Sequence, residues 1–417
     1  MSRGLGDVYK RQVKVNMNEQ TEKMKVLGTN PHKLDGVEKV TGSGVYAGDV
    51  YLPGMLHGKI KRSPHAHARI KNISIDKALE LEGVIGILTY KDVPDTRHKG
   101  SPPPRAGGLV ADQTILTGKP RFVGDGIAAV AAVSEEIATQ ALELIKVDYE
   151  VLPAVFDPDL AMQPDAPLIH EKKTNLATPP ICIEHGDVTA GIEAGDQIFN
   201  TTYTTGRPHP AYLEPNICVC QFERDGKLIV WSSTQAAFMV RGSLSEVLGI
   251  PAHDIQVIVK HMGGSFGAKQ DLYQHEYVCT LLASQTGRPV RMEYTRAETF
   301  IASKTRHPVR IEIKQGVKND GILTGRQVHY LANTGAYASH AVGITWVGCE
   351  CLATPYSCQD NLTIEGAAVY TNNPVAGAFR GFGGVQAFFA LDCQMDEISV
   401  ALGMDPVDFR LHNAVRD

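Results

Sequence analysis

Several features that would place this chain in a common class are missing from its sequence. The 41 lysines and arginines do not outnumber the 46 aspartates and glutamates, and the formal net charge is −5, so nothing indicates a nucleic-acid partner. No apolar run approaches the ~18–20 residues that span a bilayer. No signal peptide is recognisable either. We therefore expect a cytoplasmic protein that has no membrane association.

The eight cysteines also lack the spacing of a metal site. None forms a Cys-x-x-Cys pair, so the sequence supports neither a zinc site nor a ferredoxin-type cluster. The Cys-x-Cys pairs 218/220 and 349/351 are either same-face residues of strands or ligands, and the first interpretation is favoured. Scattered free thiols are typical of a reducing compartment. The cysteines are Cys182, Cys218, Cys220, Cys279, Cys349, Cys351, Cys358 and Cys393.

What is present is a chain of 417 residues, which is long enough for two or three domains and a sizeable core. Short strands and one clear helix alternate as far as Leu152. Gly126 to Val133 is an apolar run typical of a buried strand, Ser134 is a good N-cap for the helix that follows, and Val147 to Val151 predicts the next strand. This pattern favours a compact α/β domain. The Pro-, Asp- and Ala-rich segment that follows predicts a linker.

The centre of the second half is a glycine turn, His261-Met262-Gly263-Gly264-Ser265-Phe266-Gly267-Ala268-Lys269-Gln270-Asp271. A β-branched strand pattern precedes it and a helix pattern follows it. This layout points backbone N–H groups at an anion, and the glycines allow a ligand to approach the backbone closely. A tight turn that packs a helix on a sheet is the alternative, because neither the P-loop ending nor the dinucleotide fingerprint is present. The side chain of Phe266 then either packs into the hydrophobic core or forms a wall of a ligand cavity.

Two further stretches give the turn a context. Ser233-Thr234-Gln235 follows the apolar strand pattern of residues 228–231, and the glycine-rich segment Gly377-Ala378-Phe379-Arg380-Gly381-Phe382-Gly383-Gly384-Val385-Gln386 lies further on. With the glycine turn, they resemble the molybdenum-cofactor subunit of the xanthine dehydrogenase/aldehyde oxidase family. The likeness begins at about Val26. It is nearest to the bacterial xanthine dehydrogenase subunits, through residues 267–271 and Tyr337-Ala338-Ser339-His340.

The resemblance implies an α+β fold with a defined order of domains. An α/β hammerhead domain is expected over 26–152, a linker over 153–199, and the first part of the large molybdopterin-binding domain over 200–417. Residues 1–25 are expected to be a non-native or disordered leader. The first twelve look like a translated sequencing adapter.

The resemblance also implies a cofactor, namely molybdopterin, in its cytosine dinucleotide form, with molybdenum held by the dithiolene sulfurs of the pterin. Gln235 matches the family glutamine that hydrogen-bonds an oxygen on molybdenum, and Arg380 matches an arginine near the cofactor. We expect Gln235, Phe266 and Arg380 to lie near the metal without being ligands. A strand-end polar residue and a loop-bracing arginine are the plainer interpretations of Gln235 and Arg380. The matching cofactor loop is Gly263, Gly264, Ser265, Phe266 and Gly267, in which the family often has glycine instead of Ser265.

The implied reaction is oxidative hydroxylation of an N-heterocycle, with water as the oxygen source. Phe382 matches an aromatic that packs on a flat ring substrate, although a core aromatic is the alternative. Gln270 stands where the animal xanthine enzymes carry a substrate-binding glutamate, and Val347 where they carry an arginine. A purine such as xanthine or hypoxanthine is the first candidate substrate. The alternatives are aldehyde or carbon monoxide oxidation on the same scaffold, or a non-catalytic scaffold subunit.

Several parts of such an enzyme are expected on other chains. The general-base glutamate of the family belongs to a C-terminal half that no segment here matches, so no catalytic residue is assigned. A C-terminal molybdopterin-binding half or subunit, an iron–sulfur subunit and an FAD subunit are the expected partners. A natural split subunit and a truncated reading frame both remain open, and the adapter-like start favours truncation.

Overall fold

The computed structural model describes residues 28–99, 110–357 and 360–415. The leader expected over 1–25 and Cys358 lie outside these residues. Residues up to Gly44 and residues from Val45 onward form two separate units. The described part of the first unit contains α2 (Gly36–Thr41), which ends at Gly42 with φ of +74°. The rest of the fold concerns the second unit.

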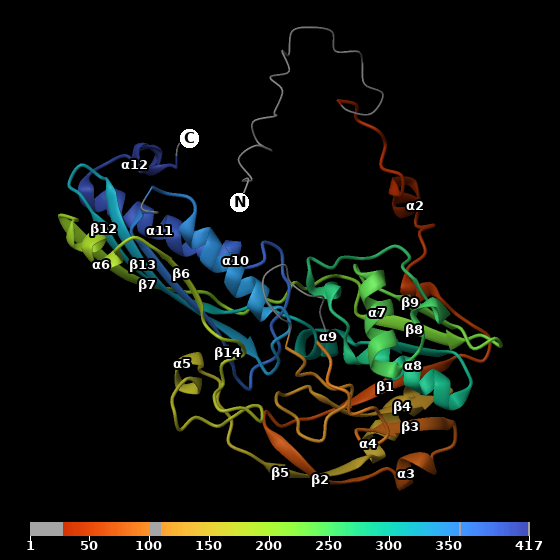
Figure 1. Cartoon of the computed structure of the whole chain (residues 1–417). Helices are drawn as coiled ribbons and strands as arrows, with labels where there is room; N and C mark the ends of the chain where they lie inside the picture. Colours follow the sequence, from red (N-terminus) through yellow and green to blue (C-terminus); the bar gives the residue numbers. More distant parts are fainter. Residues whose placement is uncertain (1–27, 100–109, 358–359, 416–417) are drawn as a thin grey trace, which may run out of the picture. The chain divides into compact units, whose positions relative to one another are not determined.

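The second unit contains a seven-stranded sheet in the order β10-β9-β8-β11-β1-β4-β3 (Figure 1). Strand β1 pairs antiparallel with β4 on one side and parallel with β11 on the other. Strands from the expected hammerhead domain and from the expected cofactor domain therefore share one sheet. The strands are β1 (Leu56–Arg62), β3 (Val84–Thr89), β4 (Gly126–Ala132), β8 (Ile217–Phe222), β9 (Leu228–Ser232), β10 (Ile255–Ile258) and β11 (Val290–Glu293).

Two helices predicted from the sequence are present beside this sheet. The Ser134 hydroxyl accepts from the amide of Ile137 and begins α4 (Glu135–Leu144), which packs on β1 and β4. Helix α8 (Gln274–Thr286) follows the glycine turn as predicted and packs on β8 and β11. The remaining elements of this region are η1 (Ala47–Asp49), α3 (Asp76–Leu79), α7 (Ala237–Leu248), η2 (Ala252–Asp254), η3 (Ala268–Gln270), α9 (Arg296–Ala302) and the two-stranded sheet of β2 (Ala68–Ser74) and β5 (Lys146–Val151).

A second sheet has five strands in the order β6-β14-β13-β12-β7. Strands β12 (Val309–Val317) and β13 (Leu323–Gly335) form an antiparallel hairpin, and Gly321 at its turn has φ of +90°. The Asp320-Gly321 pair in this turn is typical of β-hairpins. Strand β13 pairs in parallel with β14 (Leu362–Tyr370). The outer strands are β6 (Ile181–His185) and β7 (Gln197–Thr204).

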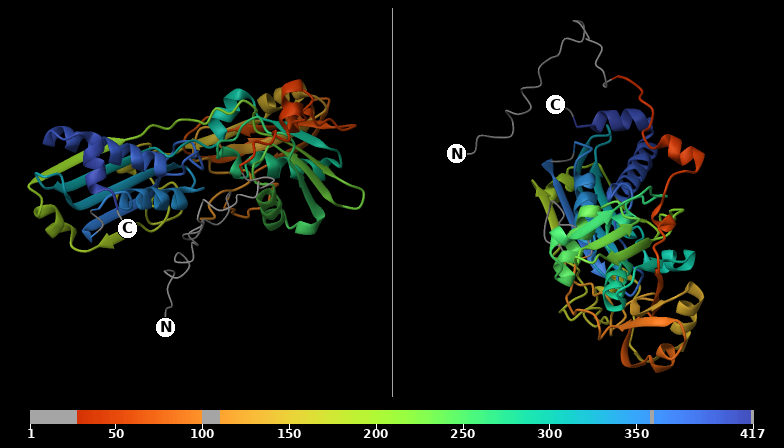
Figure 2. Two further views of the ribbon diagram at one scale, coloured as in Figure 1. Left: turned by 90° about the horizontal axis from the view of Figure 1, so that it is seen from above. Right: turned by 90° about the vertical axis from the view of Figure 1, so that its right-hand side faces the viewer.

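Helices α10 (Ala341–Ala353) and α11 (Gly384–Leu402) run over this sheet and pack on each other (Figures 1 and 2). Helix α11 ends at Gly403, which has φ of +68°. The Asp405 carboxylate then accepts from the amides of Val407 and Asp408 and begins α12 (Pro406–Asn413). A glycine directly after a helix and an Asp-Pro pair directly before the next one are usual boundary residues.

Two stretches depart from the sequence-based expectations. The segment 153–199, expected to be a linker, contains α5 (Pro158–Ala161), β6, α6 (Val188–Glu193) and the first residues of β7, so the second sheet begins before residue 200. The linker prediction rests on the Pro-rich first part of this segment, and it overlooks the short strands that follow. Cys349 and Cys351 lie in the helix α10 and not in a strand, which corrects that prediction. The β-branched residues around them favour a strand and the glycines disfavour a helix, but α10 packs on β13, β14 and α11, and these tertiary contacts outweigh the local preference.

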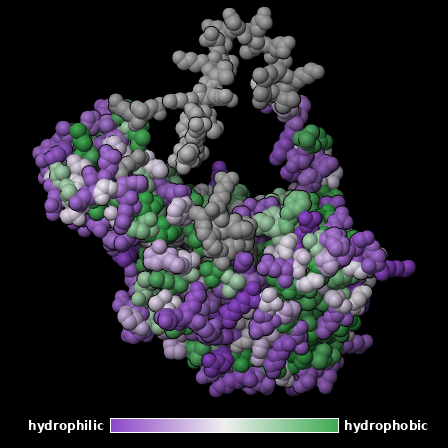
Figure 3. Space-filling view, in the orientation of Figure 1, coloured by the Kyte–Doolittle hydropathy of each residue, from purple (hydrophilic) through white to green (hydrophobic). Residues whose placement is uncertain are grey.

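Both sheets with their helices confirm the α+β fold class. Hydrophilic and hydrophobic residues are interspersed on the face shown in Figure 3. Among the described residues, no helix combines the length and the apolar character that crossing a bilayer requires.

Candidate functional site

The glycine turn, called here the glycine loop (residues 261–271), connects β10 to α8. Gly264 and Gly267 have φ of +105° and +102°, and Phe266 between them has φ of +53° with its side chain half exposed. A Cβ atom on Gly267 would lie 3.1 Å from the backbone carbon and oxygen of Ala378. The residue at 267 must therefore be glycine for both its backbone angle and its close neighbour.

Four consecutive amides of the glycine loop have no acceptor among the described residues. Within residues 28–99, 110–357 and 360–415, no hydrogen bond is formed by the N–H groups of residues 264–267. Their neighbours are bonded, since the amide of Gly263 donates to Glu214 Oε2 (2.9 Å) and that of Lys269 to Ser265 Oγ (3.1 Å). Adjacent unpaired amides in a turn form a concave donor set for anionic or oxygen-rich ligands.

A buried ion pair holds the glycine loop in place. Lys269 Nζ lies 2.9 Å from Glu214 Oε2, and the lysine side chain is 1% exposed. The ammonium group also lies 4.8 Å from the centre of the Tyr212 ring. Burial lowers the pKa of Lys269, while Glu214 acts in the opposite direction. Because Glu214 binds both Lys269 and the amide of Gly263, one carboxylate fixes both ends of the loop.

Gln235 is held against the glycine loop by Ser265. The Ser265 hydroxyl donates to Gln235 Oε1, and the amide of Gln235 donates to the Lys269 carbonyl (3.0 Å). The side-chain NH₂ of Gln235 therefore points away from Ser265 on an exposed residue. The Ser265 hydroxyl also accepts from the amide of Lys269, so this side chain connects Gln235 with the backbone of the glycine loop. The family that the sequence resembles often has glycine at this position.

A second loop, called here the aromatic loop (residues 377–384), precedes α11 and lies against the first. The Arg380 amide donates to the Phe266 carbonyl (2.9 Å), while the Arg380 side chain is exposed. Arg306 supports this contact, since its Nη2 donates to the Arg380 carbonyl (2.8 Å) and its guanidinium stacks on Phe379. Phe382 is half buried and has φ of +42°.

A buried polar cluster of Asp271, Ser339 and His340 contacts Phe382 of the aromatic loop, and the sequence analysis assigns these three residues no role. Nδ1 of His340 lies 2.9 Å from Oδ1 of Asp271, and the Ser339 hydroxyl donates to Oδ2. Burial acts to raise the pKa of Asp271, but His340, Lys304 and Ser339 outweigh it and lower this pKa. The His340 ring meets the Phe382 ring edge to face, with centroids 5.6 Å apart. Residues 269–271 and 337–340 carry the family likeness, which is the signal that could have found this cluster.

The structure brings every predicted site residue to one region. Gln235, the glycine loop and Arg380 are connected by the hydrogen bonds just described, and Gln270 lies in η3 next to Asp271. Val347, where the animal enzymes carry an arginine, is half buried in α10, whose N-cap residue is His340.

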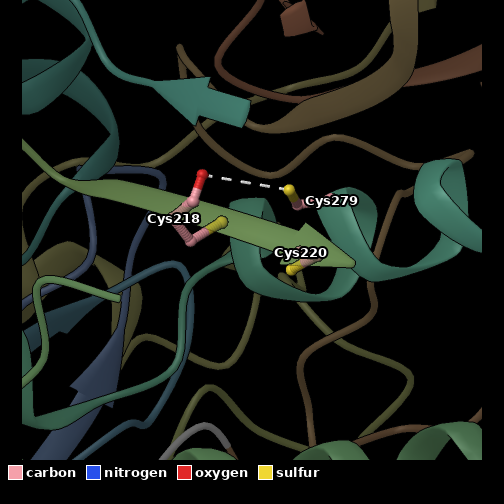
Figure 4. A group of neighbouring side chains, drawn as sticks. All are labelled: Cys218, Cys220 and Cys279. Carbon is pink, nitrogen blue, oxygen red and sulfur yellow. Dashed lines mark hydrogen bonds between the residues drawn. The ribbon is translucent and has the colours of Figure 1, made fainter. Parts of the chain in front are cut away.

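A separate cluster joins three thiols in the core of the seven-stranded sheet (Figure 4). Cys218 and Cys220 lie on β8, as the strand interpretation predicts, and the Sγ atoms of both lie within 4.8 Å of Cys279 from α8. The Cys279 thiol donates to the carbonyl of Val290 (3.0 Å), and that of Cys218 lies 3.5 Å from the carbonyl of His275. Burial raises the pKa of the Cys218 and Cys279 thiols. Protonated thiols with their own acceptors act as small core side chains.

Glu276, at the start of α8, is a buried carboxyl beside this core. It accepts from the amide of Tyr273 (2.9 Å) and the hydroxyl of Ser232 (3.1 Å). Burial raises its pKa to about 8 despite these hydrogen bonds. Its pairing with the Tyr273 backbone is the capping box of α8, so the group is structural.

Comparisons with known proteins agree with this geometry. The model of the family "Molybdopterin cofactor-binding domain" matches residues 169–414. The model of the family "Aldehyde oxidase and xanthine dehydrogenase, a/b hammerhead domain" matches residues 41–153. The chain belongs to the molybdopterin-cofactor-binding subunits of the xanthine dehydrogenase/aldehyde oxidase family.

Individual relatives support the same assignment. The chain is 40% identical over 380 residues to a probable xanthine dehydrogenase subunit of Bacillus subtilis (strain 168), covering 91% of this chain and 50% of the relative. It is 37% identical over 391 residues to the nicotinate dehydrogenase large molybdopterin subunit of Eubacterium barkeri, covering 93% of this chain and 89% of that relative. The structure of quinoline 2-oxidoreductase from Pseudomonas putida 86 superposes with a TM-score of 0.88 at 30% identity, covering 93% and 50% of the two chains. The chain thus spans about half the length of two of these three.

The residues present fit a molybdopterin. Such a group carries phosphate and metal-oxo oxygens, which are acceptors, and the glycine loop offers four amides that have no acceptor among the described residues. Gln235 adds a neutral amide donor beside them, and the exposed Arg380 a cation. No protein ligand for the metal is needed, because the pterin itself carries the sulfur ligands.

Proposed function

We propose that this chain is the first part of a molybdenum hydroxylase that oxidises an N-heterocycle, with a purine such as xanthine or hypoxanthine as the first candidate. The observation that carries the proposal is the set of unpaired amides at 264–267 beside Gln235 and Arg380. Molybdopterin, when bound, supplies the two-electron oxidation and the activation of water. Every other role below belongs to side chains and amides of this chain.

In this proposal the glycine loop binds the cofactor, and the aromatic loop orients the substrate beside it. The amides of residues 264–267 would donate to oxygens of the cofactor, and the NH₂ group of Gln235 would donate to an acceptor on its metal-bearing side. Phe266 and Arg380 would lie near the metal without acting as ligands. Phe382 offers its face to a flat ring, and Gln270 offers an amide to its edge.

A flat N-heterocycle is favoured over an aldehyde or carbon monoxide by two features of the site. Phe382 of the aromatic loop is a half-buried aromatic side chain, and Gln270 at the end of the glycine loop is a half-buried amide that can donate and accept.

The finer features of the complex are also part of the proposal. The cofactor is in the cytosine dinucleotide form, and electrons leave through an iron–sulfur subunit and an FAD subunit in the cytoplasm. A C-terminal half or separate subunit supplies the general-base glutamate. Exposed apolar side chains in the glycine loop and in the first turns of α7 and α11 support a covering partner. These side chains are Phe238, Phe266, Val385, Phe388 and Phe389.

The test is the molybdenum and pterin content of the purified chain, alone and coexpressed with a chain for the second half. We expect both to copurify with the two-chain complex, and hypoxanthine to be oxidised with an electron-accepting dye. A folded complex that contains neither molybdenum nor pterin would overturn the proposal. Cofactor without turnover of purines, aldehydes or carbon monoxide would instead favour a scaffold subunit.

A further inference from the structure

Lys304, which follows α9, is a buried cation that lacks a direct anionic partner. Its side chain is 6% exposed, and its one ion-pair contact among the described residues is to Asp271 Oδ2 at 3.9 Å, too long for a hydrogen bond. Within the same residues Nζ forms no hydrogen bond. Burial lowers the pKa of Lys304, while Asp271 and two further buried aspartates act in the opposite direction. An ammonium group at this depth requires hydrogen-bond acceptors.

Lys269 shows how the same chain holds a buried lysine directly. Its Nζ lies 2.9 Å from Glu214 Oε2, and its side chain is 1% exposed. Each of the two ammonium groups also lies over a tyrosine ring, 4.8 Å from the centroid at Lys269 and 5.7 Å at Lys304. The two lysines therefore share their burial and an aromatic neighbour, and they differ in the direct carboxylate contact. A water molecule commonly bridges polar groups that lie more than about 3.5 Å apart.

Lys304 lines a small cavity of about 40 Å³. A buried water needs roughly 10–15 Å³ of such space, so the cavity can hold about three molecules. One hydroxyl of the wall, Oγ1 of Thr114, is buried and has no hydrogen-bond partner in the described part of the chain. The other polar residues of the wall are Gln113, Asp125, Tyr273, Gln274 and Ser303.

The charges around the cavity determine which ligand fits. The Lys304 ammonium repels a second cation. The carboxylates that interact with this ammonium, those of Asp271, Asp112 and Asp125, repel an anion. The volume is also far below that of pockets for organic molecules. Water is neutral and small, and it both accepts from an ammonium and donates to oxygens, so it is the ligand that satisfies this wall.

The cavity lies where three segments of the chain meet. Thr114 belongs to the hammerhead domain. The amide of Lys304 donates to the hydroxyl of Tyr273 (3.3 Å), which comes just after the glycine loop. A Cβ atom on Gly377 would lie 2.9 Å from Cβ and Cγ of Lys304, so the lysine stem packs on the start of the aromatic loop. Groups bound in this cavity therefore connect the hammerhead domain with the surroundings of both loops.

We propose that this cavity is a site for about three buried water molecules, which accept from the Lys304 ammonium and connect it with Thr114 and Asp125. The Asp125 carboxylate can take part, because it accepts three hydrogen bonds of the about four that its two oxygens allow. Lys304 is thus joined to the hammerhead domain through water, whereas Lys269 is joined to Glu214 directly. The inference does not depend on the proposed function.

A crystal structure of the full chain at a resolution that shows ordered water tests the site. Density is expected within about 3.2 Å of Lys304 Nζ and of Thr114 Oγ1. Crystals grown in bromide and in rubidium salts should give no anomalous peak in the cavity. Such a peak would identify an ion there and overturn the proposal, as would a cavity without density or a direct hydrogen bond from Nζ to a carboxylate.

Oxygen-17 relaxation dispersion counts long-lived internal waters in solution and gives a second readout. Lys304→Met keeps the length of the side chain but removes the ammonium, and it should lower the count by about one to three. Thr114→Val removes only the hydroxyl and should lower the count by about one, which keeps the test decisive if the Lys304 variant does not fold. Thr139→Val is the matched control, because its hydroxyl donates to the Glu135 carbonyl on the exposed face of α4. A count that stays at the wild-type value in the cavity variants would overturn the proposal.

Discussion

The candidate site lies where two pairs of parallel strands end, and the two pairs contribute different chemistry. Strands β9 and β10 are parallel neighbours in the seven-stranded sheet, and Gln235 and the glycine loop follow their carboxyl ends. Strands β13 and β14 are parallel neighbours in the five-stranded sheet, and they are followed by His340 and the aromatic loop. Ligands of α/β sheets bind at such carboxyl ends.

The first pair offers mainly backbone amides, and the second mainly side chains. A backbone donor set suits a cofactor that never changes, because it depends on glycine geometry rather than on side-chain identity. A side-chain set such as Phe382 and Arg380 can be altered residue by residue without rebuilding the turn. The comparison predicts that changes near β10 affect stability and cofactor content, whereas changes near β13 and β14 affect specificity.

The strongest test of the first region is removal of its buried cation. Lys269→Met leaves Glu214 buried without its partner, which should lower the free energy of unfolding by about 3–5 kcal/mol. Urea denaturation of the purified chain measures it. Glu214→Gln in the same chain should recover part of the loss. Lys318→Met removes an exposed pair (Nζ to Asp196 Oδ1, 3.9 Å) and should cost at most about 1 kcal/mol; equal losses at both sites would refute the bracing role of Lys269.

The second test concerns pH and the helix that follows the glycine loop. Burial raises the pKa of Glu276 from 4.5 to about 8, so the folded chain retains a proton that the unfolded chain releases between these values. The contribution to stability is present below pH 4.5, decreases by at most about 1.4 kcal/mol per pH unit, and is lost above about pH 8.

Glu276→Gln should flatten this decline between about pH 5 and pH 8 in denaturation curves taken across that range. Glu246→Gln, on the exposed face of α7, should keep the wild-type slope. An unchanged slope in the Glu276 variant would mean that the carboxyl is already ionised in the folded chain.

The third test separates backbone strain from loss of the cofactor cradle. Gly267→Ala should cost about 1–2 kcal/mol for its positive φ and should also displace the aromatic loop, because the new Cβ meets Ala378. Gly249→Ala, at the end of α7, has φ of +71° with nothing within 4 Å of the new Cβ. The pterin and molybdenum content of the two-chain complex should fall only in the Gly267 variant. A similar fall in both variants would mean that loss of stability, and not loss of the cofactor-binding loop, causes the lower content.

The smallest expected effect is at Ser265. Ser265→Ala removes the hydroxyl that donates to Gln235 and accepts from Lys269, which should cost about 1 kcal/mol of stability. Since Gln235 then loses its fixed orientation, cofactor retention during dialysis should weaken more than stability does. Ser245→Ala on α7 serves as the control, and identical retention in the two variants would exclude a role for Ser265 in orienting Gln235.

Much of the local structure can be predicted because it depends on neighbouring residues. Ser134 and Asp405 begin helices, Gly403 ends one, and Asn319-Asp320-Gly321 turns a hairpin, since each effect acts within a few residues. The local pattern predicts a strand at Cys349, yet this residue lies in α10, because contacts with β13, β14 and α11 outweigh local propensity there.

The resemblance of three motifs to the xanthine dehydrogenase/aldehyde oxidase family groups the glycine loop, Gln235, Arg380 and Phe382 into one candidate site before the fold is known. Knowing which distant groups meet requires the folded chain: Cys279 with Cys218 and Cys220, Glu214 with Lys269, and His340 with Asp271. The pairing of β1 with β11 in one sheet, across the expected domain boundary, is likewise visible only in the folded chain. Such contacts join remote segments of the chain and are set by packing and burial, which no local pattern encodes.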